Sequence, residues 1–232
     1  CKTIWAFLIT VVVYNDIYHM DFFTTKYIND LIKDEYIAFI HKYYTDILSN
    51  PNKYINLVER RISKYLWWGY VRLVSSWTTA LQFGLLSLWV GEWDEVIMPA
   101  NTYSATAIAV TNIWAVPVFA DINLKNYTID FVDIEKKITS KTKFIIPVHL
   151  YWYYCYMDEI LDVANKYNLK VLEDASHNFW WEYKEQKLWT LWDVWAFSCH
   201  LSKNFWTFGH WWVFYTEDKV LFDRIDDYIF PD

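Results

Sequence analysis

The sequence predicts an α/β protein, a three-layer sandwich whose central sheet is mostly parallel. Two observations carry this prediction. Short, continuous apolar runs recur along the chain, and stretches with helical periodicity separate them. Apolar runs without alternation suit strands that are buried on both faces, and such strands alternating with helices are typical of parallel sheets. We expect strands at residues 95–99, 116–120, 144–150, 170–172 and 194–199.

The helices are expected from the spacing of apolar residues and from their start signals. Residues 35–66 carry an apolar stripe at helical spacing, which includes Val58 and Ile62. Hydroxyl residues at 75–79 open the next helix, Ala80–Leu88, because such side chains satisfy the free N–H groups of a helix start. Further helices are expected from 105 through 112, and at 129–138, 157–167 and 218–228.

A chain of 232 residues is long enough for one large hydrophobic core. It contains no linker, internal repeat or low-complexity block, so we interpret residues 35–232 as a single domain. Residues 1–34 are interpreted as an N-terminal extension. The apolar segment 4–14 is shorter than the ~20 residues that a membrane span needs, and it lacks the features of a signal peptide. We therefore expect no membrane association.

Charge and cysteine content exclude some classes of function. The formal net charge is -7 and no block rich in lysine or arginine occurs, so we expect no binding to nucleic acid. The three cysteines, Cys1, Cys155 and Cys199, are an odd and widely spaced set without a C-x-x-C pair. Such a set favours a reducing compartment, which we take to be the cytoplasm, and we assign no metal site.

Glycine is rare in this sequence and tryptophan is abundant. There are 4 glycines beside 16 tryptophans, whereas ordinary usage of ~7% would give roughly 16 glycines. Several tryptophans, such as Trp89 and Trp93, occupy a turn between a helix and a strand, where glycine is favoured. We interpret most of them as glycine codons read through another genetic code, since UGA specifies tryptophan in one code and glycine in another. The alternative is a protein that is truly rich in tryptophan.

Two segments carry the candidate chemistry. An apolar run at 171–172 ends in Glu173 and Asp174, and a second run continues through Ser198 to Lys203. A lysine that can form a Schiff base and an acid that can hold a pyridinium proton are the groups that pyridoxal phosphate needs from an enzyme. In parallel sheets ligands bind at the carboxyl ends of strands. Tyr103, Asp174 and Ser198 are all expected at or just beyond such ends.

These segments belong to an ordered set of seven motifs, which resembles the sugar aminotransferases of the DegT/StrS group. That group lies within the fold-type I enzymes that depend on pyridoxal phosphate. The family has S-G-T-x-A-L, G-x-G-D-E-V and I-P-V-H-L-Y-G where this chain repeatedly has tryptophan in place of glycine, which supports the codon hypothesis. The motifs are Ser76–Leu81, Gly91–Val96, Pro117–Asp121, Ile146–Trp152, Glu173–His177, Phe197–Ser198 and Lys203–Asn204.

The resemblance implies pyridoxal 5'-phosphate as the cofactor and assigns the two central residues. Lys203 resembles the lysine that binds the cofactor covalently and later acts as the general base. Asp174 resembles the acid that pairs with the pyridine nitrogen. The alternatives from the residues alone are a surface lysine and a helix-capping aspartate. The expected fold is the large domain of the fold-type I transferases.

The resemblance also implies the rest of the cofactor site. Trp77 and Thr78, together with Ser198, resemble the cup that holds the phosphate. Tyr103 matches the aromatic residue that stacks on the ring, and His177 falls near the phenolic oxygen. Core packing remains the alternative for Tyr103, and a structural role the alternative for His177. His149 lies in a family motif, but we assign it no chemistry.

The implied reaction is a ping-pong transamination. An amino acid, glutamate in most of the family, donates the amino group, and a keto group of a nucleotide-linked deoxysugar receives it. The resemblance implies a homodimer and a role in cell-surface polysaccharide or aminosugar biosynthesis. The family's small C-terminal domain is absent and the chain begins with cysteine, so we interpret it as a truncated fragment.

Other functions remain open from the sequence. One alternative is a catalytically inactive fragment or pseudoenzyme of the same fold. Others are a dehydratase or a desulfurase. The dehydratases of the family replace the lysine with histidine, and a desulfurase needs a mobile cysteine that neither Cys155 nor Cys199 convincingly supplies. Lys203 therefore favours transamination.

Overall fold

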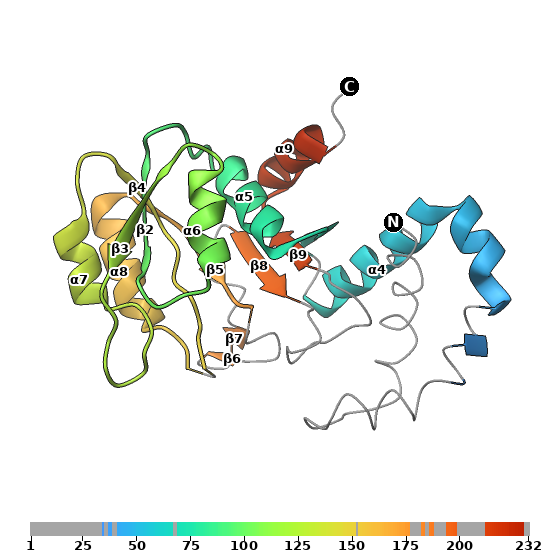
Figure 1. Cartoon of the computed structure of the whole chain (residues 1–232), viewed down its shortest axis with the longest axis horizontal. Coiled ribbons are helices and arrows are strands. Elements are labelled where there is room, and N and C mark those ends of the chain that lie inside the picture. The colour runs from blue at the N-terminus through green and yellow to red at the C-terminus, as the bar shows by residue number, and fades with distance from the viewer. Residues whose placement is uncertain are drawn as a thin grey trace.

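The computed structural model describes residues 34, 37–38, 41–66, 69–151, 153–176, 182–183, 186–187, 194–198 and 212–229. Within these residues, seven strands form one sheet in the order β1-β9-β8-β5-β4-β2-β3 (Figure 1). A short hairpin joins β6 to β7. The strands are β1 (Tyr70–Val74), β2 (Glu95–Pro99), β3 (Val116–Ala120), β4 (Thr142–Ile145), β5 (Lys170–Asp174), β6 (Glu182–Tyr183), β7 (Gln186–Lys187), β8 (Val194–Ser198) and β9 (Trp212–Thr216).

Most of the sheet is parallel, as the sequence predicts. The neighbouring pairs β3 and β2, β2 and β4, β4 and β5, and β5 and β8 are all parallel. Only β9 runs the other way, because it pairs antiparallel with β8 on one side and with β1 on the other. It follows that β1 has the same direction as β8, and the carboxyl ends of these six strands share one edge of the sheet.

Helices cover both faces of the sheet, which confirms the three-layer prediction. Side chains alternate between the faces of a strand, so Val96 and Met98 pack with α5, α6 and α9, whereas Ile97 packs with α7 and α8. Figure 1 shows α9 lying beside α5. The helices are α4 (Pro51–Tyr65), α5 (Trp77–Ser87), α6 (Ser104–Thr111), α7 (Phe131–Lys137), α8 (Met157–Tyr167) and α9 (Lys219–Ile229). In the part of the chain described here, no helix combines the length and apolar character that crossing a bilayer requires.

Local sequence explains several helix boundaries. Asp130 caps α7 by accepting the N–H of Val132 at 3.0 Å. The acidic residues Asp158 and Glu159 lie in the first turn of α8, where they complement the helix dipole. Asn168 ends α8 in the left-handed conformation with φ 52°, which asparagine adopts more readily than most residues.

The sequence prediction is wrong in several details, among them the start of α5, which is Trp77 instead of Ala80. The expected helix over 35–66 is interrupted at Asn50, since Pro51 has no N–H to continue a preceding helix and instead begins α4. The expected strand at 144–150 begins earlier, at 142, and β4 ends at 145. Strands β1 and β9 were not expected at all. Their runs of aromatic and β-branched residues are the local signal that could have indicated them.

Tryptophan occupies backbone positions that ordinarily belong to glycine. Trp89, Trp93 and Trp114 have φ values of 60°, 69° and 62°. In this left-handed region a Cβ atom crowds the following carbonyl oxygen, at a cost of roughly 1–2 kcal/mol per residue. Trp114 is also 73% exposed, so its indole recovers little by burial. Glycine adopts this conformation without strain, as the codon hypothesis expects, but Tyr127 and Tyr151 also adopt it, with φ values of 59° and 51°.

Replacing Trp93 or Trp114 by glycine is expected to raise the free energy of unfolding by about 1 kcal/mol each, because the left-handed strain disappears. Urea denaturation measures the change. The matched control is Trp195→Gly. Trp195 is fully buried in β8, so this substitution is expected to lower stability by about 3–5 kcal/mol. A loss of stability in both exposed variants would contradict the account.

The codon hypothesis has its own test in the mass of the native protein. Peptides covering positions 77, 89 and 93, isolated from the source organism, are expected to carry the mass of glycine there. Tryptophan masses at these three positions would refute it.

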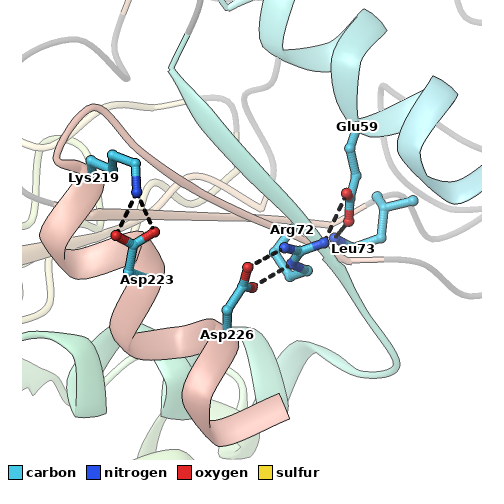
Figure 2. A network of polar contacts seen from close by, with 6 residues as sticks. All are labelled: Glu59, Arg72, Leu73, Lys219, Asp223 and Asp226. Atoms are coloured by element: carbon cyan, nitrogen blue, oxygen red, sulfur yellow. Dashed lines mark hydrogen bonds and ion pairs between the residues drawn. The ribbon is translucent and has the colours of Figure 1, made fainter. Parts of the chain in front are cut away.

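A partly buried ion network joins the edge strand of the sheet to two helices. Arg72 on β1 binds Asp226 of α9 with two hydrogen bonds, of 2.9 and 2.6 Å, and binds Glu59 of α4 at 3.0 Å (Figure 2). Glu59 also accepts the N–H of Leu73 at 3.0 Å. Burial raises the pKa of the Glu59 carboxyl, although the Leu73 N–H and the Arg72 guanidinium act to lower it. Arg72 thus supplies the counter-charge of the Glu59 carboxylate, and the Leu73 N–H supplies a further hydrogen bond to it.

Removing this guanidinium is expected to destabilise the fold. Arg72→Met leaves the Glu59 carboxylate buried without a counter-charge, which costs about 3–5 kcal/mol at neutral pH. A carboxyl with a higher pKa in the folded than in the unfolded protein stabilises at low pH, and this contribution is lost as the pH rises through the folded pKa. Arg72→Met raises the folded pKa further. Its stability deficit, measured by denaturant titration, should therefore be larger at pH 7 than at pH 5.

The exposed ion pair in Figure 2 provides the control. Lys219 binds Asp223 at 2.6 Å one turn away on α9, and both side chains are more than half exposed. Water and salt screen such pairs, so Lys219→Met should leave stability nearly unchanged. Equal losses in Lys219→Met and Arg72→Met, or a deficit independent of pH, would contradict this account of the network.

Candidate active site

The site is expected where several strands end together. The carboxyl end of β1 leads into the start of α5, and the carboxyl end of β2 leads to Tyr103. Asp174 is the last residue of β5 and Ser198 the last of β8, and these two strands are neighbours. All four segments therefore reach the same edge of the sheet. This is the edge at which parallel α/β sheets bind ligands.

The start of α5 can hold an anion. The Ser76 side chain accepts the N–H of Thr79 at 3.0 Å, and the Ser76 carbonyl accepts the N–H of Ala80. The N–H groups of Trp77 and Thr78 precede these in the first turn, where a helix has no internal acceptor for them. Aligned N–H groups and the helix dipole attract phosphate. The Trp77 indole itself is 8% exposed and packs in the core.

Asp174 is a buried carboxylate on the α5 side of the sheet. It is 2% exposed, and strand alternation places it on the same face as Leu172. Leu172 packs so closely against α5 that a Cβ atom at Gly84 would collide with it. The N–H of Ser176 donates to the Asp174 carboxylate at 3.2 Å. A carboxylate therefore lies at the end of a central strand, on the face of the sheet that carries the anion-binding helix start.

The remaining predicted site residues are described to different extents. Tyr103 is the N-cap residue of α6 and is 74% exposed, so its ring is accessible from solvent. Ser198 pairs with Trp212 of β9 through the backbone, and its side chain lies outside the described part of the structure. His177 and Lys203 both lie outside the described residues.

The chemistry of the described residues fits pyridoxal phosphate. The cofactor has an anionic phosphate, an aromatic ring and a ring nitrogen that an acid can keep protonated. The start of α5 suits the phosphate, Tyr103 suits the ring and Asp174 suits the nitrogen. Among the described residues, no group of three His, Cys, Asp or Glu side chains could hold a metal ion.

One pair of residues near the site was not assigned any role from the sequence. His149 Nε2 lies 2.7 Å from Glu173 Oε1, and both side chains are fully buried. The signal that could have found the pair is a polar residue within each of two apolar runs. Pairing these residues also requires knowledge that β4 and β5 are neighbours.

The chain belongs to the DegT/DnrJ/EryC1/StrS aminotransferase family, whose sequence model matches residues 31–228. This confirms the resemblance drawn from the seven motifs. A similar curated relative is GDP-perosamine synthase of Escherichia coli O157:H7, 37% identical over 177 residues, which cover 76% of this chain and 48% of the relative. Another is 3-oxo-glucose-6-phosphate:glutamate aminotransferase of Bacillus subtilis (strain 168), 42% identical over 152 residues, which cover 64% of this chain and 34% of the relative.

Solved structures agree with the fold. NtdA of Bacillus subtilis with bound cofactor PMP has a TM-score of 0.75 and 36% identity, covering 86% of this chain and 45% of that one. DesV of S. venezuelae has a TM-score of 0.79 and 28% identity, covering 90% of this chain and 56% of that one. The fold is therefore that of the fold-type I aminotransferases that depend on pyridoxal phosphate. The chain spans about half the length, or less, of the curated relatives described above.

Proposed function

We propose that this protein is an aminotransferase that uses pyridoxal phosphate. It moves an amino group from an amino acid donor, which we take to be glutamate, to a keto group of a nucleotide-linked deoxysugar. The observation that carries the proposal is the buried Asp174 at the same sheet edge as the start of α5. The names of the relatives support the substrate class, since they include GDP-perosamine synthase and a glutamate aminotransferase.

Different residues would bind different parts of the cofactor. The N–H groups at the start of α5 would hold the phosphate with help from hydroxyl groups, Asp174 would pair with the ring nitrogen and Tyr103 would stack on the ring. By the family resemblance, His177 would act near the phenolic oxygen and Lys203 would bind the cofactor covalently. The residues that would bind the phosphate are Trp77, Thr78 and Ser198.

The cofactor, when bound, supplies an electron sink that makes the substrate Cα–H bond acidic. The protein supplies charge and proton transfer. The Asp174 carboxylate keeps a proton on the ring nitrogen, because an opposite charge at short range favours the protonated form. With the cofactor bound, the Lys203 amine would act as the general base that takes the Cα proton of the donor and delivers a proton to C4′ of the cofactor. The N–H groups at the start of α5 would hold the phosphate and so keep the ring in position.

The biological setting follows from the same class of reaction. Amination of a nucleotide-linked sugar serves cell-surface polysaccharide or aminosugar biosynthesis, and a relative of this chain is the spore coat polysaccharide biosynthesis protein SpsC of Bacillus subtilis (strain 168). The odd, widely spaced cysteines favour the cytoplasm. We also propose a homodimer, as in the family.

The half-reaction with glutamate tests this function. The protein loaded with pyridoxal phosphate is mixed with L-glutamate and no acceptor, and 2-oxoglutarate is measured. About one equivalent per loaded site is expected, since the second half-reaction lacks its substrate. A loaded protein that forms no keto acid from any amino acid would show that the site binds the cofactor without transamination, as an inactive fragment would.

A further inference from the structure

A buried polar network lies on the opposite side of β5 from the candidate site. Its side chains are His149, Glu173 and Trp195, each fully buried. Adjacent residues in a strand point to opposite faces, so Glu173 faces the α8 side while Asp174 faces the α5 side. Buried polar groups are costly unless each is hydrogen-bonded. A network of this kind next to the site therefore calls for an explanation.

The hydrogen bonds of the network are directional. The N–H of Cys155 donates to His149 Nδ1 at 3.1 Å, which requires a lone pair on that nitrogen. The other ring nitrogen, Nε2, then carries the proton and donates it to Glu173 Oε1 at 2.7 Å. The second oxygen of Glu173 accepts the indole N–H of Trp195 at 3.0 Å. Each oxygen of this carboxylate thus has one donor, from a different part of the sheet.

The same segments are joined through the backbone at Asp174. The N–H of Asp174 donates to the Pro147 carbonyl at 3.0 Å, and the N–H of His149 donates to the Asp174 carbonyl at 3.1 Å. On the other side of β5, Asp174 is in register with Ala196 of β8. A rotation of the strand that turned Asp174 would also turn Glu173 and break its hydrogen bonds. The network therefore resists twisting at this one point of β5.

We propose that His149 and Glu173 are positioning residues, which fix the direction of the Asp174 carboxylate toward the cofactor's ring nitrogen. This role rests on the proposed function. The pair does not touch the cofactor, because it lies on the other face of the sheet. It acts by holding the residue that does. In metal sites, partners that orient a ligand from behind contribute 10- to 100-fold in affinity or activity.

The experiment compares cofactor affinity and the visible circular dichroism of the bound cofactor in three variants. His149→Leu removes the donor to Glu173 and is expected to raise the dissociation constant of pyridoxal phosphate about 10- to 100-fold and to weaken the dichroic band. His149→Gln keeps an N–H that can reach Glu173 and should recover most of both signals. Thr142→Val is the matched control, since Thr142 is buried and bonded to Glu95 at the amino end of β4, away from the site. It should lower stability without changing the dissociation constant.

The variants distinguish a positioning role of His149 and Glu173 from a general effect on stability. Unchanged affinity and dichroism in His149→Leu would overturn the positioning role while leaving the proposed function intact. Equal losses of affinity in His149→Leu and Thr142→Val would overturn it too, because the effect would then be one of stability alone. If His149→Leu does not fold, Glu173→Gln replaces it with the same expectation, since its amide cannot accept from both donors. An unsubstituted protein that binds no cofactor would overturn the proposed function and this role together.

Discussion

Asp174→Asn is expected to lower the turnover number by two to three orders of magnitude. The amide carries no charge, so it cannot hold a proton on the ring nitrogen, and it is nearly the same size as the carboxylate. Loss of one partner from a buried charge pair costs on the order of 3–4 kcal/mol, which corresponds to this change in rate. Steady-state turnover with glutamate and an acceptor sugar measures it. The Michaelis constants should change far less, because Asp174 does not contact either substrate.

The control for this variant is Asp121→Asn. Asp121 follows β3 directly, much as Asp174 ends β5, but it is exposed, and β3 is the outermost strand, separated from β5 by β2 and β4. Its turnover should stay within a factor of about three, in line with the small effects of surface substitutions. Turnover of Asp174→Asn within a factor of ten of the parent would contradict the role of this carboxylate.

Lys203→Ala is expected to reduce turnover at least as much, since a positioned general base contributes about 10²- to 10⁴-fold. The substitution also leaves a space where the amine stood. A small primary amine such as ethylamine, added to the buffer, should therefore restore part of the activity in proportion to the concentration of its unprotonated form. Turnover of Lys203→Ala is measured as a function of amine concentration and pH.

The rescue distinguishes a missing base from a damaged fold. Lys203→Arg, whose guanidinium stays protonated, should be as inactive as the alanine variant and should not respond to added amine. Full activity of Lys203→Ala without added amine would show that another group is the base.

Much of the fold could be predicted from local pattern. Helix α8 agrees with its prediction residue for residue, because a strong apolar stripe at helical spacing is combined with acidic residues at its start. Strands β2 and β3 agree equally well, since each is a short apolar run between clear breaks. The edge strand β1 and its neighbour β9 were not predicted, because their pairing joins residues as far apart as Tyr70 and Thr216. Local sequence does not specify so distant a partner.

The candidate site, too, has features that local sequence predicts and others that depend on how the strands are arranged. The position of Asp174, Tyr103 and the start of α5 at one edge of the sheet could be predicted, because the motifs follow predicted strands and parallel strands end at one edge. The bonds between Arg72 and Asp226 span 154 positions of sequence. The pair His149 and Glu173 depends on which strands are neighbours. Both pairs, Arg72 with Asp226 and His149 with Glu173, are brought together by the sheet topology, so the sequence pattern alone does not reveal them.

Titration of the protein with pyridoxal phosphate, followed by visible absorption, shows whether Lys203 binds the cofactor. We expect an absorption band of a lysine-bound cofactor that saturates at about one equivalent per chain. The band should disappear in Lys203→Ala and persist in Lys136→Ala, whose side chain is 68% exposed on α7. Absence of the band in the unsubstituted protein, or its persistence in Lys203→Ala, would contradict the account.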